Sequence, residues 1–230
     1  MQGIKRELGN HVQHKLHITP QILLDMEKVI IKSDCNERIF YAARLVAFFT
    51  LFQKANLTAP SESGFDSSIH LSCGDFAFCG SGLMLITSQW SKTNQFRERV
   101  LKFPVAPTSG FELNAVLHVQ LYFAADPASA SNAAFRVKKG RKYVLMTGNW
   151  FAKKLAEVLT RAGFPPKDYS GHSFRAGGAT WAMECGLSRE MIKLLGDWKS
   201  DAYLDYLRLS DDVKVVAACT LANTLHYKIG

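Results

Sequence analysis

The chain has 230 residues, of which 47% are hydrophobic and 21% are charged. This composition supplies enough apolar side chains for a sizeable core and excludes a chain that is disordered throughout. The 28 lysines and arginines against 20 aspartates and glutamates give a formal net charge of +8, which fits a domain that binds a polyanion, although an ordinary basic protein explains it equally well.

The amino-terminal part is predicted to be an arm followed by two helices. Residues 1–17 show little apolar periodicity and are expected to be a linker, either the remnant of a junction to a missing domain or a plain disordered terminus. Thr19-Pro20 is a helix-start signal, and helical spacing of apolar residues follows it. A second helix is predicted over Asn36–Leu57, with its apolar middle in the core.

The middle of the chain predicts a small antiparallel sheet of three short strands separated by tight turns. The expected strands are Ile69–Phe78, Leu83–Trp90 and Arg99–Val105. A small-residue loop is expected over Ala125–Ala134. The basic run from Lys138 to Lys142 is expected in a loop, as a solvated turn more than as a track for DNA.

The remaining elements are predicted to be helical, so the fold class is α+β, mostly helical with one three-stranded sheet. These helices are Asn114–Tyr122, Asn149–Ala162, Ser173–Glu184, Ser188–Leu195, Ala202–Leu209 and Asp212–Leu225. The helix over Ser188–Leu195 is predicted to start from a serine cap and to stop at Gly196.

The cysteines and the apolar runs indicate in which cellular compartment the chain works and whether it enters a membrane. The five cysteines contain no CxxC pair, so neither a disulfide framework nor a zinc site is expected. The amino terminus has no apolar stretch typical of a secretory signal. The run Leu45–Phe52 is far shorter than the about 20 residues of a membrane span. We therefore expect an intracellular chain that needs no metal or other cofactor and no membrane.

The stretch from Ser170 to Ser210 carries the strongest chemical signal. His172 and Arg175 are three residues apart at a helix start and share one face, where the helix dipole favours an anion such as a phosphodiester. Gly177 and Gly178 imply close approach by another helix or by a DNA backbone. HxxR alone is weak evidence, because a capped helix with a surface arginine explains it more simply.

Two aromatic residues strengthen the signal. Trp198 lies 23 residues after Arg175, beyond the next predicted helix, and Tyr206 lies on a short helix after Ser200-Asp201. A tyrosine hydroxyl has a pKa near 10, so it is a nucleophile only where cationic donors stabilise the developing charge.

These motifs resemble those of the tyrosine recombinases, or phage integrases. The resemblance rests on HSFR, LLGDW and DAYLDYL, and upstream on WSKTNQF, FFTLFQKANL and KLHITPQILL. It is closest to the recombinases of eukaryotic DIRS-type mobile elements, and it implies a catalytic domain over residues 18–230.

The resemblance implies DNA strand breakage and rejoining, as in recombination and integration. Tyr206 would attack a phosphate and form a 3′-phosphotyrosyl link, with Arg175 and His172 on the non-bridging oxygens. Trp198 would donate its indole N–H to the phosphate or pack the pocket. Lys92 would protonate the leaving 5′-oxygen, or contact the DNA backbone only. The chemistry implies neither metal nor ATP.

The sequence departs from the family at the position of its first catalytic arginine, which is Gln53 here. Losing a charged donor costs on the order of 10²–10³ in rate. Lys54 is expected to face away from the direction of Gln53, because successive residues of an α-helix are rotated by about 100° about the helix axis. Arg44 lies about 13 Å back along the helix axis, too far to substitute. We therefore expect weak or absent cleavage with DNA binding retained.

The expected partner is double-stranded DNA, contacted by Lys54, Arg97 and Arg99 as well as by the catalytic residues. The carboxy-terminal stretch Val213–Leu225 either docks onto a neighbouring protomer, giving a homo-oligomer such as a tetramer on DNA, or folds back onto its own domain. A eukaryotic host implies the nucleus, and otherwise the cytoplasm. The alternatives are a catalytically inactive DNA-binding module derived from a mobile element, and an interaction protein with no role on DNA.

Overall fold

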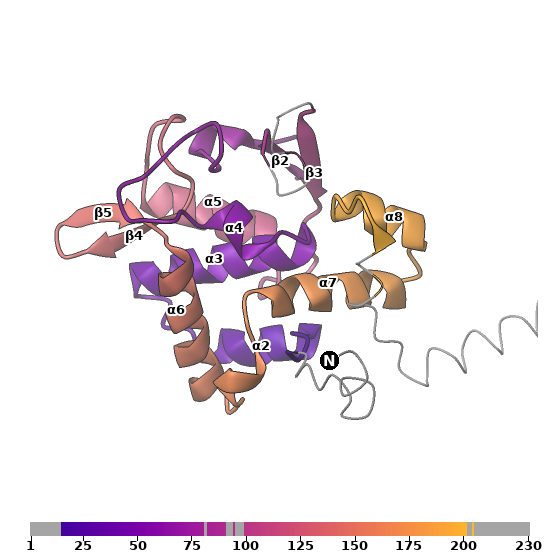
Figure 1. The fold of residues 1–230 in the computed structure, drawn as a ribbon. Helices are drawn as coiled ribbons and strands as arrows, with labels where there is room; N and C mark the ends of the chain where they lie inside the picture. Colours follow the sequence, from indigo (N-terminus) through magenta and orange to yellow (C-terminus); the bar gives the residue numbers. More distant parts are fainter. Residues whose placement is uncertain (1–14, 81, 91–93, 95–98, 202–203, 205–230) are drawn as a thin grey trace, which may run out of the picture.

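A computed structural model describes residues 15–80, 82–90, 94, 99–201 and 204. Its helices and strands are arranged around one long central helix, α3 (Cys35–Phe49; Figure 1). The first helix, α2, spans Pro20–Lys28 and begins as predicted: the Thr19 side chain accepts from the Ile22 N–H, and proline occupies the first turn. Residues 15–17, which were expected to be arm, contact the folded body, since the Leu16 N–H donates to the Asp168 carbonyl at 2.7 Å.

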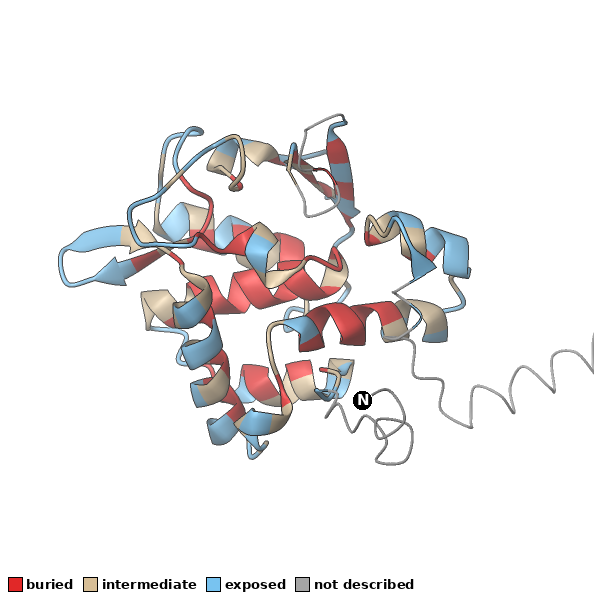
Figure 2. Cartoon of the chain, in the orientation of Figure 1, coloured by how far each residue is buried: buried red, intermediate tan, exposed pale blue. Residues whose placement is uncertain are grey.

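The central helix α3 spans Cys35–Phe49 and is buried along most of its length (Figure 2). The predicted continuous helix over Asn36–Leu57 is wrong. Helix α3 ends at Phe49, Leu51 has a φ of 57°, and a short helix α4 begins at Lys54 and ends at Leu57. A left-handed residue interrupts a right-handed helix, so the directions of side chains before and after this break cannot be related by the rotation of one helix.

The predicted three-stranded sheet is confirmed, with shorter strands. Strand β1 spans Phe76–Phe78, β2 spans Met84–Ser88 and β3 spans Leu101–Val105, with β2 in the middle and both pairings antiparallel. Alternate residues of β2 and β3 are buried, as expected where one face covers a core. A 3-10 turn, η1 over Cys73–Asp75, precedes β1.

A second, two-stranded sheet replaces the loop predicted for the basic run. Helix α5 spans Ala115–Ala125, and strands β4 (Arg136–Lys139) and β5 (Lys142–Leu145) form an antiparallel hairpin. The side chain of Asn36 anchors this hairpin, accepting from the Lys138 N–H at 2.7 Å and donating to the Lys138 carbonyl at 2.9 Å.

Three helices complete the described part, and all three were predicted. Helix α6 spans Gly148–Arg161, α7 spans His172–Glu184 and α8 spans Arg189–Leu195, with a 3-10 turn, η2, over Pro166–Asp168. An ion pair joins α6 to α3: Nη2 of the exposed Arg161 lies 2.8 Å from the carboxylate of the buried Glu37. The two helices predicted after residue 201 lie outside the described residues, apart from residue 204. No described helix is long and apolar enough to cross a membrane.

Candidate active site

Close backbone contacts fix the position of helix α7. A Cβ atom on Gly177 would lie 1.8 Å from the Ile18 carbonyl oxygen, and one on Gly178 would lie 2.2 Å from the Phe48 carbonyl oxygen. The two glycines therefore do mark a close approach. Of the two predicted alternatives, the approach of another helix is confirmed at Gly178, whose neighbour Phe48 lies on α3, and Gly177 meets the backbone of Ile18 just before α2.

Arg175 lies at the centre of the site. It is 5% exposed, its Nη1 donates to the Leu51 carbonyl, and its Nη2 donates to the Gly196 carbonyl at 2.8 Å. The Trp198 ring covers the guanidinium, with its centroid 3.9 Å from Cζ. Arg175 thus joins α7 to the turn before α4 and to the end of α8. Of the two roles expected for Trp198, this contact is packing; donation to a phosphate stays a prediction.

Two residues of this arrangement were not singled out as site residues. Leu51 presents its carbonyl to Arg175 from a left-handed conformation, and nothing in the sequence around it marks that turn. Gly196 was predicted only as a helix stop. A Cβ atom there would lie 1.7 Å from the Trp198 ring, so only glycine leaves room for the stacked indole.

His172 is the first residue of α7 and is exposed, with its backbone N–H 3.3 Å from the Ser170 hydroxyl oxygen. As predicted, it lies three residues before Arg175, on the first turn of the helix. Gln53 precedes α4 in an extended conformation, half-buried, and its N–H donates to the Asn56 side chain at 2.9 Å.

The helical rotation that was used to turn Lys54 away from Gln53 does not apply, because Gln53 and Lys54 do not belong to one continuous helix. The Lys54 side chain packs against Gly171, which precedes His172. Arg44 is fully buried on α3, donates to the Leu23 carbonyl at 3.1 Å and stacks on Tyr41, so it serves another part of the fold.

Arg99 forms an ion pair with Asp197, the residue before Trp198. This pair lies along a cleft of about 880 Å³ between β3 and α8, whose walls include the exposed side chains of Met191 and Leu194. Three of the predicted site residues, Lys92, Arg97 and Tyr206, lie outside the described residues.

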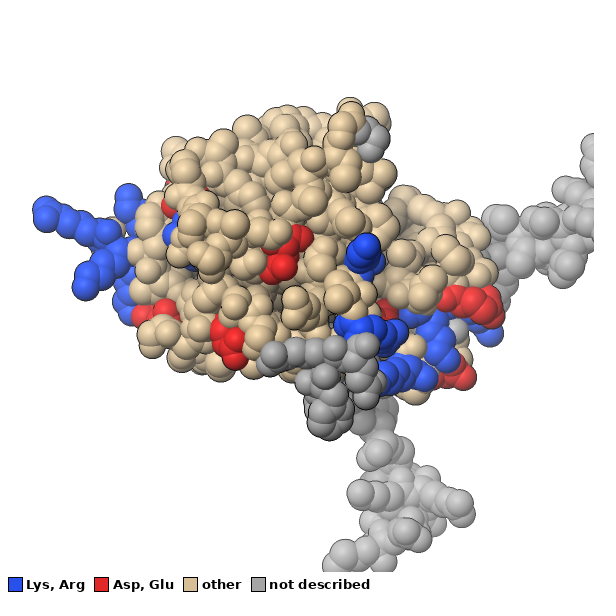
Figure 3. Space-filling model, turned by 90° about the horizontal axis from the view of Figure 1, so that it is seen from above, with Lys and Arg blue, Asp and Glu red and all other residues tan. Residues whose placement is uncertain are grey.

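The basic run forms the tip of the β4–β5 hairpin, which projects from the molecule at the end opposite α8 (Figures 1 and 3). Its lysines and arginine are exposed, and Lys139 pairs with Glu62 at 2.9 Å. The prediction of a solvent-exposed basic turn holds for the side chains, although the backbone is a hairpin.

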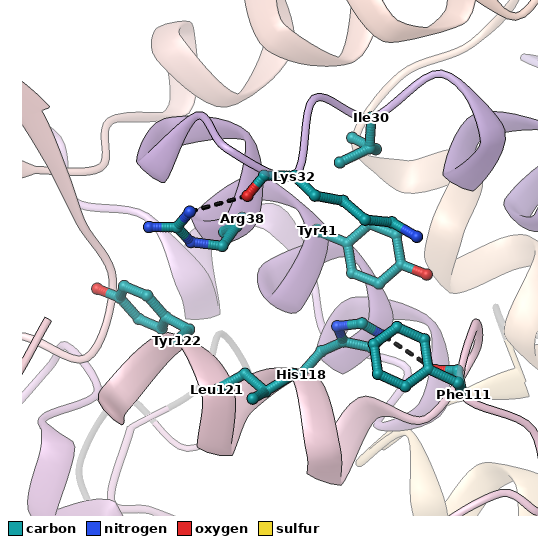
Figure 4. A pocket seen from close by; sticks show the side chains of 8 residues that line it. All are labelled: Ile30, Lys32, Arg38, Tyr41, Phe111, His118, Leu121 and Tyr122. Atoms are coloured by element: carbon teal, nitrogen blue, oxygen red, sulfur yellow. Dashed lines mark hydrogen bonds between the residues drawn. The ribbon is translucent and has the colours of Figure 1, made fainter. Parts of the chain in front are cut away.

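A separate cavity of about 110 Å³, which Arg175 does not line, lies between α3 and α5 (Figure 4). Aromatic rings line it: His118 lies 4.2 Å from the Tyr41 ring centroid and 4.8 Å from that of Phe111. Burial lowers the pKa of His118 and raises that of Tyr41, whose hydroxyl donates to the Glu112 carbonyl. Because Phe111 and Leu121, which also line the cavity, are exposed, the cavity lies at the edge of the core and opens to solvent.

In the described part of the chain, no three His, Cys, Asp or Glu side chains gather as a metal site would require.

No family model matches the sequence, and no curated protein is similar to it. Comparison with solved structures gives clear matches. The XerA recombinase superposes with a TM-score of 0.62 over 95% of this chain, at 15% sequence identity. The chain has the tyrosine recombinase fold. The XerH site-specific recombinase bound to its palindromic difH substrate matches with a TM-score of 0.62 over 91% of this chain, at 16% identity. The Tn1549 transposon integrase in complex with transposon right end DNA matches with a TM-score of 0.61 over 95%, at 14% identity.

The chain covers only part of each relative with this recombinase fold: 65% of XerA, 54% of XerH and 70% of the Tn1549 integrase. The predicted fold class and the predicted likeness to tyrosine recombinases are thereby confirmed for the described residues.

Proposed function

We propose that this chain is a DNA-binding domain of tyrosine recombinase type, derived from a mobile element, that breaks and rejoins DNA strands slowly. One observation carries the proposal: in a chain with the recombinase fold, the HxxR pair stands on the first turn of α7, with Arg175 at the junction of α7, α8 and the turn before α4. The first turn of a helix of this length favours a bound phosphate.

The proposed reaction exchanges one phosphodiester for another. The Tyr206 hydroxyl releases its proton to solvent as its oxygen attacks the phosphorus, the bond from phosphorus to the 5′-oxygen breaks, and the leaving 5′-oxygen takes a proton from Lys92 to become a hydroxyl. His172 and Arg175 stabilise the charge on the non-bridging oxygens. Rejoining is the same exchange in reverse, because the phosphotyrosyl link keeps the energy of the broken bond.

Gln53 sets the expected rate. An amide can hydrogen-bond a phosphate, but it brings no charge and no bidentate fork. We expect slow cleavage in the wild type and faster cleavage in Gln53→Arg, by a factor on the order of 10².

A suicide-substrate assay tests the proposal by trapping a covalent adduct between protein and DNA. Slow adduct formation by the wild type, its loss in Tyr206→Phe and its increase in Gln53→Arg would support it. Rapid adduct formation by the wild type would contradict the role of Gln53, and unchanged activity of Gln53→Arg would show that residue 53 is not the first-arginine position.

A second candidate is an inactive DNA-binding module. Two observations favour it: Gln53 is uncharged, and both terminal nitrogens of Arg175 donate to backbone carbonyls. Salt-dependent DNA binding with no adduct from either the wild type or Gln53→Arg would support this candidate over the first.

A further inference from the structure

The side chain of Lys54 lies in a slot between the starts of two helices. A Cβ atom on Gly171, just before α7, would lie 3.1 Å from Cβ and 3.2 Å from Cδ of Lys54. A Cβ atom on Gly148, the first residue of α6, would lie 3.1 Å from both Cε and Nζ. The two glycines therefore leave room for the lysine stem, which leads from the start of α7 to the start of α6.

The break after α3 creates this placement. Because Gln53 is extended, with φ of −74° and ψ of 153°, α4 begins afresh at Lys54. The lysine stem consequently lies against Gly171, the residue directly before α7, and its ammonium lies by Gly148 at the start of α6. The Thr58 hydroxyl donates to the Lys54 carbonyl at 2.9 Å and so helps to fix this short turn.

The ammonium group sits where positive charge is already concentrated. Helices α6 and α7 have 14 and 13 residues, and both present their amino-terminal ends here. A helix amino terminus favours an anion and disfavours a cation. Within the described part of the chain, no carboxylate forms an ion pair with Lys54. This arrangement becomes favourable once an anion lies between the ammonium and the two helix ends.

We propose that Lys54 binds a DNA phosphate at the junction of the first turns of α6 and α7, and so supplies the positive charge that Gln53 does not. The inference rests on the proposed function, because DNA is the source of the phosphate. It gives Lys54 a contact beside His172, and it explains why a glycine stands at both ends of the slot.

The test measures binding of a random-sequence duplex across about 50–200 mM salt. Lys54→Met keeps the apolar stem and removes the charge, whereas Lys54→Arg restores it. Lys153→Met is the matched control, because Lys153 is an exposed lysine on the outer part of α6. One lost phosphate contact lowers the magnitude of the slope of log K against log salt by about 0.9. We expect that change in Lys54→Met, with an unchanged slope in Lys54→Arg and Lys153→Met.

Gly148→Ala tests the same contact in a second way, because it leaves the charge of Lys54 in place. Its Cβ displaces the ammonium by a few tenths of an ångström, so we expect weaker DNA binding with an unchanged unfolding midpoint. If the wild type binds with a salt-dependent slope and Lys54→Met behaves as Lys153→Met does, the role of Lys54 is overturned and the proposed function stands. A flat slope in the wild type would overturn the proposed function itself.

Discussion

Helices α3 and α7 each bury an arginine under an aromatic ring, but the two regions use the charge differently. Arg44 is 0% exposed and lies 4.2 Å from the Tyr41 ring centroid, and Arg175 is 5% exposed and lies 3.9 Å from that of Trp198. Arg44 donates to the Leu23 carbonyl inside α2, where helix geometry already supplies a donor. Arg175 donates to the carbonyls of Leu51 and Gly196, which both lie outside helices.

The difference shows that burial and ring stacking do not by themselves mark a functional arginine. Burial lowers the pKa of Arg44 to about 10, although Tyr41 and Glu27 oppose the shift, so this cation bears a desolvation cost. Arg175 instead joins α7 to the turn before α4 and to the end of α8. Four predictions test this contrast.

The largest effect is expected from Gly177→Ala, which would separate α7 from residue 18. The added Cβ would meet a backbone carbonyl oxygen at 1.8 Å, which cannot move as a flexible side chain can. We expect a loss of about 3 kcal/mol or more in the free energy of unfolding, the upper end of overpacking costs. Urea unfolding measures it. Gly171→Ala is the control, since its Cβ meets only the Lys54 side chain; equal losses in the two variants would refute the contact.

Arg175→Met should cost about 2–4 kcal/mol, because it leaves two buried carbonyls without their donor, at about 1–3 kcal/mol each, and removes the stacking on Trp198. Denaturant unfolding at neutral pH measures the loss. A cost below about 1 kcal/mol would mean that the two carbonyls find other donors and that Arg175 is not a structural tether.

The core beside Arg44 should weaken in acid through His118. Burial lowers the pKa of this imidazole below its usual 6.5, outweighing the hydrogen bond with the Phe111 carbonyl. Its neutral form therefore contributes stability that is fully present above pH 6.5 and is lost as the pH falls toward the folded-state pKa, because the unfolded chain binds the proton first. From about pH 7 to about pH 5, the unfolding midpoint of the wild type should fall further than that of His118→Phe. Parallel falls would show that His118 is not buried in its neutral form.

Arg44→Met should have the smallest effect, within about 1 kcal/mol of the wild type, since replacing a buried charge with an apolar side chain of similar size is often neutral or stabilising. DNA binding should not change. A loss as large as that of Arg175→Met would erase the contrast between the two arginines.

Local signals predicted most of the fold. The Thr19 and Ser188 caps, the glycine stop after α8 and the alternation of β2 and β3 all correspond to short-range chemistry that one stretch of sequence contains. The HxxR pair was likewise placed at the start of its helix, because three residues on one face need only a helix to bring them together.

The sequence failed where tertiary contacts decide the conformation. The turn at Leu51 contains no glycine or proline, and a left-handed leucine is uncommon enough that no local rule predicts it. The β4–β5 hairpin was missed because its lysines suggested a solvated loop, while the Asn36 side chain that anchors it is far away in sequence. The position of Lys54 depends on the first of these errors, since only a broken helix turns it toward α7.

The salt dependence of duplex binding by the wild-type chain tests the central claim most directly, because phosphate contacts release counterions and most other interactions do not. We expect log K to fall linearly with log salt, by about 0.9 for each phosphate held. Binding that is absent, or that does not change with salt, would contradict a DNA phosphate at the start of α7.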